Sequence, residues 1–411
     1  MKPTVLVAAT TRWLPTARLA IALANAGCAV EAVCPSRHAL AKTTAVRKVH
    51  RYRGLMPTAS FAAAITSARP DLIVPGDDLA TRHLHSLYNR ERRRGKAGAP
   101  ICELIERSLG APESFPVVNS RAPFIELAQK DGIRVPQTAI IGNIDDLKEW
   151  GRQRGFPAVL KTNGSSGGYG VRIVSTLKEA ERAFRELQAP PLLARVAKRS
   201  VVDQDLTLIW PLLLRRRPVV NAQTFVAGRE ATSLVACWKG AVLAGLHFEV
   251  LNKQDPTGPA SVLRLITNAD MSGAAEKMAR RLNLSGLHGF DFMLEAHTGK
   301  PYLIEINPRA TQVGHLALGP GRDLPAALYA AMTGRAVQEA PRVTEKDTVT
   351  LFPQEWARNP ESPFLQSGYH DVPWGEPELI RACVRRRRKW AAWYAEQEWA
   401  QAFSAVRRVG L

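Results

Sequence analysis

A chain of 411 residues is long enough for two or three domains, and its 45% hydrophobic and 23% charged residues are ordinary for a globular protein. The five cysteines are scattered without a CxxC pair, which argues against a disulfide framework or a zinc site, and no apolar run reaches the ~20 residues of a membrane helix. The formal net charge of +19 implies attraction to anions such as nucleotides, phosphorylated substrates, nucleic acid or acidic membrane, without choosing among them. We therefore expect a cytoplasmic protein with no membrane span, and TTRW at 10–13 argues against a signal peptide.

The N-terminal part alternates between apolar strands and a helix. Strands are predicted at TVLVAA (4–9), AVEAVCP (29–35) and PDLIVP (70–75), and a helix at LPTARLAIALANAG (14–27). This alternation predicts a parallel α/β sheet. The turn after the first strand, TTRWLPT, lacks the GxGxxG of dinucleotide sites, so we expect no nicotinamide or flavin there.

Asp77 and Asp78 follow the third of these strands. Because sheet proteins often place ligand-binding groups just beyond a strand end, both are candidate substrate residues. The alternative is that they only form the turn.

Further along, FPVVNSRAPFIELAQKDGIRVPQT (115–138) predicts a strand, an N-cap at Ser120, a helix and a loop closed by Pro136. A second helix over DDLKEWGRQRG (145–155) precedes the strand FPAVLKT (156–162).

A glycine-rich segment, KTNGSSGGYGV (161–171), begins at the end of that strand. The Walker loop places its lysine after the glycines and leads into a helix, whereas Lys161 precedes the glycines and VRIV (171–174) reads as another strand. The pattern therefore predicts a strand–loop–strand flap, in which Lys161 reaches phosphates and the Gly/Ser backbone folds over them. A plain Gly-rich turn is the alternative reading.

A second motif, GLHGFDFMLEAHTGKPYLIEINPR (286–309), reads as a hairpin of two strands. Alternation places Glu305 and Asn307 on one face, and Asp291 on the partner strand can join them. Two carboxylates and an amide oxygen suit Mg²⁺ (or Mn²⁺) that bridges nucleotide phosphates. Acidic residues that face solvent are the alternative.

With these motifs the chain resembles the ATP-grasp superfamily over residues 3–335, in particular the branch near carbamoyl-phosphate synthetase and the carboxylate–amine ligases. The resemblance implies a mixed α/β and α+β fold with three parts: a Rossmann-like pre-ATP-grasp domain at 1–118, a two-lobed ATP-grasp domain at 119–335, and a C-terminal extension at 336–411. It also implies that ATP lies between the lobes and phosphorylates a carboxylate, which an amine or other nucleophile then attacks.

The resemblance also implies roles for single residues. Lys161 and Arg309 match catalytic, phosphate-facing positions, and Asp291, Glu305 and Asn307 match magnesium ligands. Further residues match nucleotide-binding positions. In the flap these are Gly164, Ser165, Ser166, Gly167, Gly168 and Gly170. In the hinge they are Gln223, Thr224, Phe225 and Val226, and Glu230 and Arg121 match two further positions. Arg264 falls in a segment that often meets the substrate.

The chain departs from the family pattern at three places. Gln223 stands where the hinge usually begins with Glu, and Arg121 stands near a common lysine position. The interval between Lys161 and Gln223 is long, with an insertion expected around RSVVDQDLTLIWPLLLRRRP (199–218). These departures bear on the adenine contacts and the lobe boundary rather than on the metal–phosphate core.

The C-terminal segment lies outside the resemblance. LFPQEWARNPES (351–362) and YHDVPWGEPE (369–378) predict an ordered extended segment, and a helix is expected over 377–403. Its RRRRK run (385–389) with Trp390, Trp393 and Tyr394 can serve RNA or membrane binding, but an amphipathic helix packed on the enzyme is favoured. His247, His288 and His315 are isolated and carry no site argument.

These observations predict an ATP- and Mg²⁺-dependent carboxylate–amine (or carboxylate–thiol) ligase of the ATP-grasp type. Its partners would be small-molecule carboxylate and amine substrates; a nucleic-acid partner is not favoured, and an oligomer is left open. The alternatives are a kinase-like protein that stops at phosphate transfer, or a nucleotide-binding module without ligase activity whose basic tail engages nucleic acid.

Overall fold

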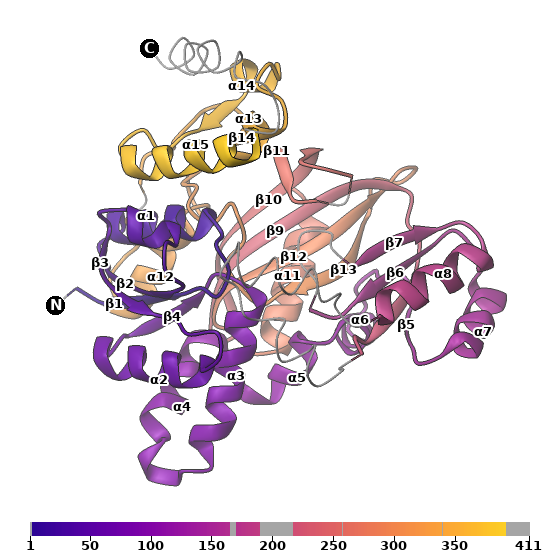
Figure 1. The fold of residues 1–411 in the computed structure, drawn as a ribbon, viewed down its shortest axis with the longest axis horizontal. Helices are drawn as coiled ribbons and strands as arrows, with labels where there is room; N and C mark the ends of the chain where they lie inside the picture. Colours follow the sequence, from indigo (N-terminus) through magenta and orange to yellow (C-terminus); the bar gives the residue numbers. More distant parts are fainter. Residues whose placement is uncertain (1, 165–169, 190–216, 257, 339, 392–411) are drawn as a thin grey trace.

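The computed structural model describes residues 2–164, 170–189, 217–256, 258–338 and 340–391, and it arranges them around three sheets (Figure 1). The first sheet is parallel and has the strand order β3-β2-β1-β4. Its elements are β1 (Thr4–Ala8), α1 (Pro15–Asn25), β2 (Ala29–Cys34), β3 (Val46–Arg51), α2 (Pro57–Ala68), β4 (Leu72–Pro75), α3 (Asp78–Arg92) and α4 (Ala99–Leu109), with 3₁₀ turns η1 (Ala39–Lys42), η2 (Gly95–Ala97) and η3 (Pro112–Ser114). Because β1 and β4 are buried between helices, they consist almost entirely of apolar residues. The predicted parallel α/β sheet is confirmed.

The second sheet forms a small lobe of four antiparallel strands in the order β5-β8-β6-β7. It comprises β5 (Thr138–Ile141), α7 (Ile144–Arg154), β6 (Ala158–Thr162), β7 (Val171–Val174), α8 (Leu177–Gln188) and β8 (Val220–Thr224). Asn143 caps α7 and Thr176 caps α8 through side-chain oxygens that accept backbone N–H groups. The two helices pack on one face of the sheet and leave the other face, with Lys161, toward the large sheet.

The third sheet has seven strands in the order β13-β12-β9-β10-β11-β14-β15. Its elements are β9 (Gly228–Trp238), β10 (Ala241–Lys253), β11 (Ala260–Leu265), α11 (Ala269–Arg281), β12 (Gly286–Glu295), β13 (Pro301–Asn307), α12 (Leu324–Thr333), β14 (Thr348–Leu351) and β15 (Tyr369–Asp371). Helix α11 covers one face, and α12 covers part of the other.

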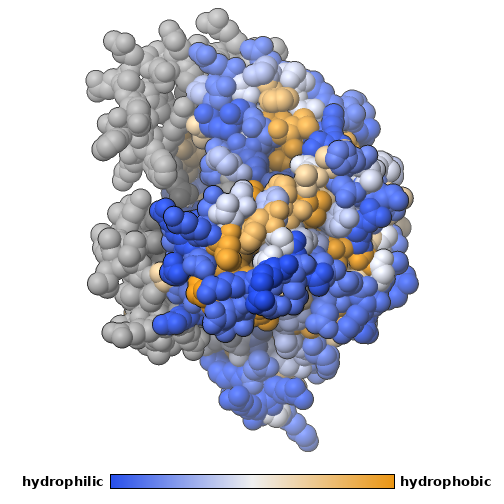
Figure 2. Space-filling view, turned by 90° about the vertical axis from the view of Figure 1, so that its right-hand side faces the viewer, coloured by the Kyte–Doolittle hydropathy of each residue, from blue (hydrophilic) through white to orange (hydrophobic). Residues whose placement is uncertain are grey.

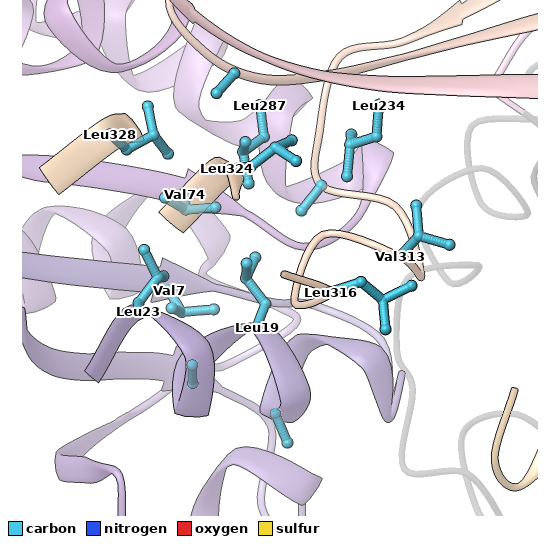
Figure 3. Close-up of a cluster of buried hydrophobic side chains, with 14 of the residues drawn as sticks. Val7, Leu19, Leu23, Val74, Leu234, Leu287, Val313, Leu316, Leu324 and Leu328 are labelled. Atoms are coloured by element: carbon cyan, nitrogen blue, oxygen red, sulfur yellow. The ribbon is translucent and has the colours of Figure 1, made fainter. Parts of the chain in front are cut away.

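The N-terminal sheet and the large sheet share one hydrophobic core. Figure 3 shows Val7 and Val74 of the first sheet, with Leu19 of α1, close to Leu234 of β9 and Leu287 of β12. Helix α12 and the loop after β13 fill the space between them. The small lobe has a separate core of its own side chains, among them Trp150 and Phe184. The small lobe and this larger body therefore have separate hydrophobic cores on the two sides of the cleft between them.

Two predictions about local structure are wrong. FPVV forms a short helix, α5 (Phe115–Val118), rather than a strand, and leads into α6 (Arg121–Lys130) at the expected N-cap Ser120. Phe115 is buried against Tyr88 and His85 of α3, so tertiary packing overrides the β propensity of this apolar run.

The C-terminal segment is also less extended than predicted. It contains α13 (Gln354–Arg358), α14 (Phe364–Ser367) and α15 (Pro377–Ala391), and its strands β14 and β15 extend the large sheet. In Figure 1 this segment lies above α1. The boundaries predicted at 118 and 335 stay predictions, but the large sheet continues beyond residue 335. The side chains of RRRRK and residues 392–411 lie outside the description.

No helix among the described residues is long and apolar enough to span a bilayer. The five cysteines are free thiols, and four of them are buried.

Candidate active site

A cavity of about 610 Å³ opens where the small lobe, the large sheet and the N-terminal sheet meet. It is within the size range of small-molecule sites. Figure 2 faces the small-lobe side and shows hydrophobic residues gathered between polar ones; exposed hydrophobic side chains of this lobe include Ile140, Ile173 and Phe225. The predicted site residues that line the cavity are Asp77, Asp78, Arg121, Lys161, Gln223, Thr224, Phe225, Val226, Glu230, Asp291, Glu305, Asn307 and Arg309.

The glycine-rich segment connects β6 to β7, which pair as an antiparallel hairpin with Lys161 opposite Val171. The predicted strand–loop–strand geometry is therefore confirmed. Gly164 and Gly170 have φ of 68° and 88°, the left-handed region that favours glycine. Ser165, Ser166, Gly167 and Gly168 lie outside the described residues.

Lys161 projects from β6 into the cavity and is only 6% exposed. Burial, and after it the nearby Arg121, lowers the pKa of its ammonium to about 7, against the opposing effect of Asp291 and Glu230. No ion pair joins it to another residue in the described ranges. An anionic ligand would stabilise the charged form of this buried ammonium, because it would supply the missing ion-pair partner.

The hinge residues are the last two of β8, Gln223 and Thr224, and the two that follow it, Phe225 and Val226. Gln223 is buried and donates from Nε2 to Thr138 Oγ1 at 3.0 Å. Phe225 and Val226 line the cavity beyond it, and Glu230 pairs with Lys253 Nζ at 2.6 Å. The hinge thus offers an apolar wall beside a paired carboxylate.

The β12–β13 hairpin brings the three predicted metal ligands together. Asp291 lies directly opposite Glu305, and Asn307 Nδ2 donates to Asp291 Oδ2 at 2.8 Å. Thr232 Oγ1 donates to the other Asp291 oxygen at 2.8 Å. Burial raises the pKa of Asp291, and these two hydrogen bonds offset the rise only in part.

This oxygen-donor set fits a hard divalent cation such as Mg²⁺, which would also compensate the buried charge of Asp291. The described residues contain no group of three or more His, Cys, Asp or Glu side chains suited to a metal. The Asp291–Glu305–Asn307 set has only two carboxylates, because its third oxygen donor is the amide of Asn307.

Two arginines flank the carboxylates. Arg121, at the first position of α6, forms an ion pair with Glu305. Arg309 Nε lies 3.1 Å from Asp78 Oδ1, and its Nη2 donates to Asn307 Oδ1 at 3.2 Å. Cations and carboxylates therefore alternate across the floor of the cavity, an arrangement that suits the oxygens of a polyphosphate.

Comparison with known proteins agrees with this geometry. Residues 215–313 match the family described as ATP-grasp domain. The carbamoyl phosphate synthase large chain of Xylella fastidiosa is 24% identical over 241 residues, 56% of this chain. Residues 215–313 therefore resemble an ATP-grasp domain.

Solved structures share the fold of this chain. The biotin carboxylase domain of Hydrogenobacter thermophilus 2-oxoglutarate carboxylase, in complex with MgADP, ADP and bicarbonate, has a TM-score of 0.57 at 15% identity over 82% of this chain and 71% of that one. An N5-carboxyaminoimidazole ribonucleotide synthetase in complex with ADP has a TM-score of 0.56 at 13% identity, over 83% and 79% of the two chains. The chain spans only 20% of the length of the Xylella relative.

Among the residues that line this cavity, Asp77 has a structural role. Its carboxylate caps α3 and accepts the backbone N–H groups of Thr10, Thr11 and Ala80 and the hydroxyl of Thr10. The turn-forming alternative therefore describes its observed contacts, whereas Asp78 orients Arg309.

Arg264 does not line this cavity. On β11 its side chain points to the opposite face of the large sheet, where Nη2 lies 2.6 Å from Glu249 Oε2. Arg229 Nη1 approaches the other oxygen of the same carboxylate at 2.5 Å. Strand alternation places Arg264 on the face opposite to Leu263 and Leu265, which face the shared core.

Sequence reasoning missed several lining residues, namely Trp13, Thr232, Lys253, Thr311 and Gln312. Thr232 could have been found from alternation along β9, which places it on the face of Glu230. Trp13 carried one signal, its place in the turn after the first parallel strand, where such sheets bind ligands. The others have no motif of their own.

Proposed function

We propose that the chain is an ATP- and Mg²⁺-dependent ligase that activates a carboxylate as an acyl phosphate for attack by an amine or thiol. The observation that carries the proposal is the convergence of Lys161, the Asp291–Glu305–Asn307 set and Arg309 on one cavity. Nucleotide-bound relatives with this fold support it.

The nucleotide would lie in the cleft between the small lobe and the large sheet. Its base would lie against the hinge at Phe225 and Val226, and its phosphates would extend toward Lys161. The ammonium of Lys161 would regain its proton as it meets the phosphate charge, because an adjacent anion favours the charged form.

Asp291, Glu305 and Asn307 would hold the metal against the phosphate oxygens. When bound, Mg²⁺ supplies neutralisation of the charge that develops as the phosphoryl group moves. Binding there requires Glu305 to loosen its ion pair with Arg121, which frees that guanidinium for a phosphate oxygen.

The chemistry needs positioning more than a protein nucleophile. A carboxylate oxygen of the substrate attacks the γ-phosphorus, the bond from that phosphorus to its bridging oxygen breaks, and ADP leaves. The amine or thiol then attacks the acyl carbon, inorganic phosphate departs, and the nucleophile gives up a proton to water. Arg309, held by Asp78, is placed to meet the transferred phosphoryl group.

The test is interception of the acyl phosphate. The purified chain is incubated with MgATP, pooled carboxylates and hydroxylamine, which displaces phosphate and leaves a stable hydroxamate. We expect ADP and a hydroxamate in equal amounts, identified by mass spectrometry. ADP released with no hydroxamate from any carboxylate would contradict the proposal.

Omitting hydroxylamine separates a ligase from a kinase. A ligase releases ADP at a sustained rate only when the second nucleophile is present, whereas a kinase needs none.

A further inference from the structure

One end of the cavity is formed by the N-terminal sheet rather than by the ATP-grasp lobes. There the carboxyl ends of β1 and β4 meet, and the chain leaves them in opposite directions around the sheet. Parallel sheets bind ligands at this point. Thr11, Trp13 and Gly76, which follow β1 and β4 in the chain, line the cavity here.

Trp13 is the one aromatic side chain at this end among the described lining residues, and it is half-buried. No other described aromatic ring packs against it, and no hydrogen bond to a described residue holds its indole N–H. The remaining wall includes apolar side chains from β10, β11, the connection between them and the loop after β13, namely Val250, Pro256, Pro259, Ala260 and Val313. An indole face and an apolar wall thus border the same space.

The charged groups at this end already have partners. The Asp77 carboxylate accepts hydrogen bonds from the backbone of Thr10, Thr11 and Ala80, and Asp78 and Arg309 pair with each other. Recognition of a second phosphate or carboxylate here would require breaking one of these pairs, which costs free energy. The described residues therefore favour an uncharged group.

A buried hydroxyl at this end has no partner. Thr311 Oγ1 is inaccessible to solvent and makes no hydrogen bond within the described residues. Thr311 lies in the loop that continues from Arg309, and it lines the same cavity. A buried polar atom without a partner is costly, and a ligand atom can satisfy it.

We infer that this end of the cavity binds an aromatic, uncharged group of the substrate, which stacks on Trp13 and places a polar ring atom on Thr311 Oγ1. The inference rests on the proposed function, since it describes the substrate that the ligase would join. Aromatic stacking on Trp13 selects flat rings over saturated ones of similar size. The paired charges disfavour substrates with an additional phosphate or carboxylate at this end.

The test measures binding of amino acids, which offer both a carboxylate and an amine, to the full chain with MgADP. L-Phenylalanine, L-cyclohexylalanine and O-phospho-L-serine are compared by saturation-transfer NMR titration. We expect L-phenylalanine to bind most tightly, and Trp13→Ala to weaken it roughly threefold to tenfold, while Trp13→Phe retains the preference. Trp374→Ala is the matched control, because Trp374 is 54% exposed and does not line the cavity.

Thr311→Val tests the hydroxyl while keeping its shape. L-Tyrosine and L-tryptophan carry a polar ring atom, so the variant should weaken their binding by roughly twofold to tenfold and leave L-phenylalanine unchanged.

Three outcomes overturn the inference: tighter binding of O-phospho-L-serine, unchanged preference in Trp13→Ala, or no binding of any aromatic probe at millimolar concentration. MgADP affinity and hydroxamate formation report on the proposed function separately, because Trp13 lies away from the nucleotide. A chain that forms hydroxamates from non-aromatic acids would retain the proposed function and lose this inference.

Discussion

The side chain whose chemistry depends most on its surroundings is Lys161. The pKa of its ammonium is lowered to about 7, first by burial and then by Arg121. In the free protein it is therefore charged below about pH 7 and largely neutral at pH 8. A bound polyphosphate favours the charged form and raises the pKa again.

We predict that MgATP binding at pH 8 takes up a proton and that affinity falls as pH rises above 7. Calorimetry in two buffers of different ionisation enthalpy measures the uptake. Lys161→Arg should remove this proton uptake, because the guanidinium stays charged throughout.

Lys161→Ala should weaken MgATP binding at pH 6 on the order of tenfold to a hundredfold, because a charge-assisted contact is lost. Equal affinity of this variant and the wild type would place the phosphates elsewhere.

Glu305 tests the metal set at the same scale. Glu305→Gln keeps the shape and removes one ligand charge opposite Asp291. We predict that ADP release falls far more than nucleotide affinity, because several kcal/mol of metal stabilisation act as the phosphoryl group moves. Steady-state kinetics with this variant measure the rate of ADP release, and calorimetry measures its nucleotide affinity. Near wild-type turnover would show that this hairpin holds no catalytic metal.

Among the elements, β15 is fixed by a buried charge cluster. Asp371 Oδ1 lies 2.5 Å from Arg18 Nη2 of α1, and its Oδ2 lies 2.7 Å from His315 Nε2. His315 belongs to the same loop as Thr311 and Val313, which line the cavity. The cluster therefore joins the C-terminal segment, the first helix and the loop after β13 that lines the cavity.

Removing the shared carboxylate should destabilise this junction. Asp371→Ala leaves the buried Arg18 and His315 without compensation, at a cost of about 3–5 kcal/mol. We predict a clear drop in the thermal unfolding midpoint, measured by circular dichroism. Glu378→Gln is the control, because its ion pair with Arg381 is exposed and contributes little. Equal midpoints for the two variants would contradict this account.

At the scale of the whole molecule, the division of the cores predicts two units of different stability. The small lobe packs only against itself, whereas the two larger sheets share side chains such as Leu19 and Leu234. Regions with a small separate core open more readily than the rest. Backbone amides of β6 and β8 should therefore exchange hydrogen faster than those of β1 and β9.

MgATP should slow exchange in the small lobe more than elsewhere, because the nucleotide would bridge Lys161 to the large sheet. Hydrogen-exchange mass spectrometry with and without MgATP measures this difference. Uniform protection across both units would argue that they open together.

The sequence alone determined those features that depend on local pattern and spacing. Alternation in EIN predicted Glu305 and Asn307 on one face with Asp291 on the partner strand, and strand patterns on both sides of the glycines predicted a hairpin. Such features need only the strand period and the conformational freedom of glycine. FPVV shows the limit, because its conformation depends on burial against α3.

Tertiary structure decided what the site residues meet. No local pattern could join Arg121 to Glu305 or Arg309 to Asp78, because these partners lie far apart in the chain and meet only when the sheets assemble. Alternation along β11 could place Arg264 on one face, but only the packed sheet shows that this face carries Glu249 and lies away from the cavity. The same assembly places Trp13 and Thr311 on one cavity and extends the large sheet with β14 and β15. Long-range packing and charge pairing, rather than propensity, decide these contacts.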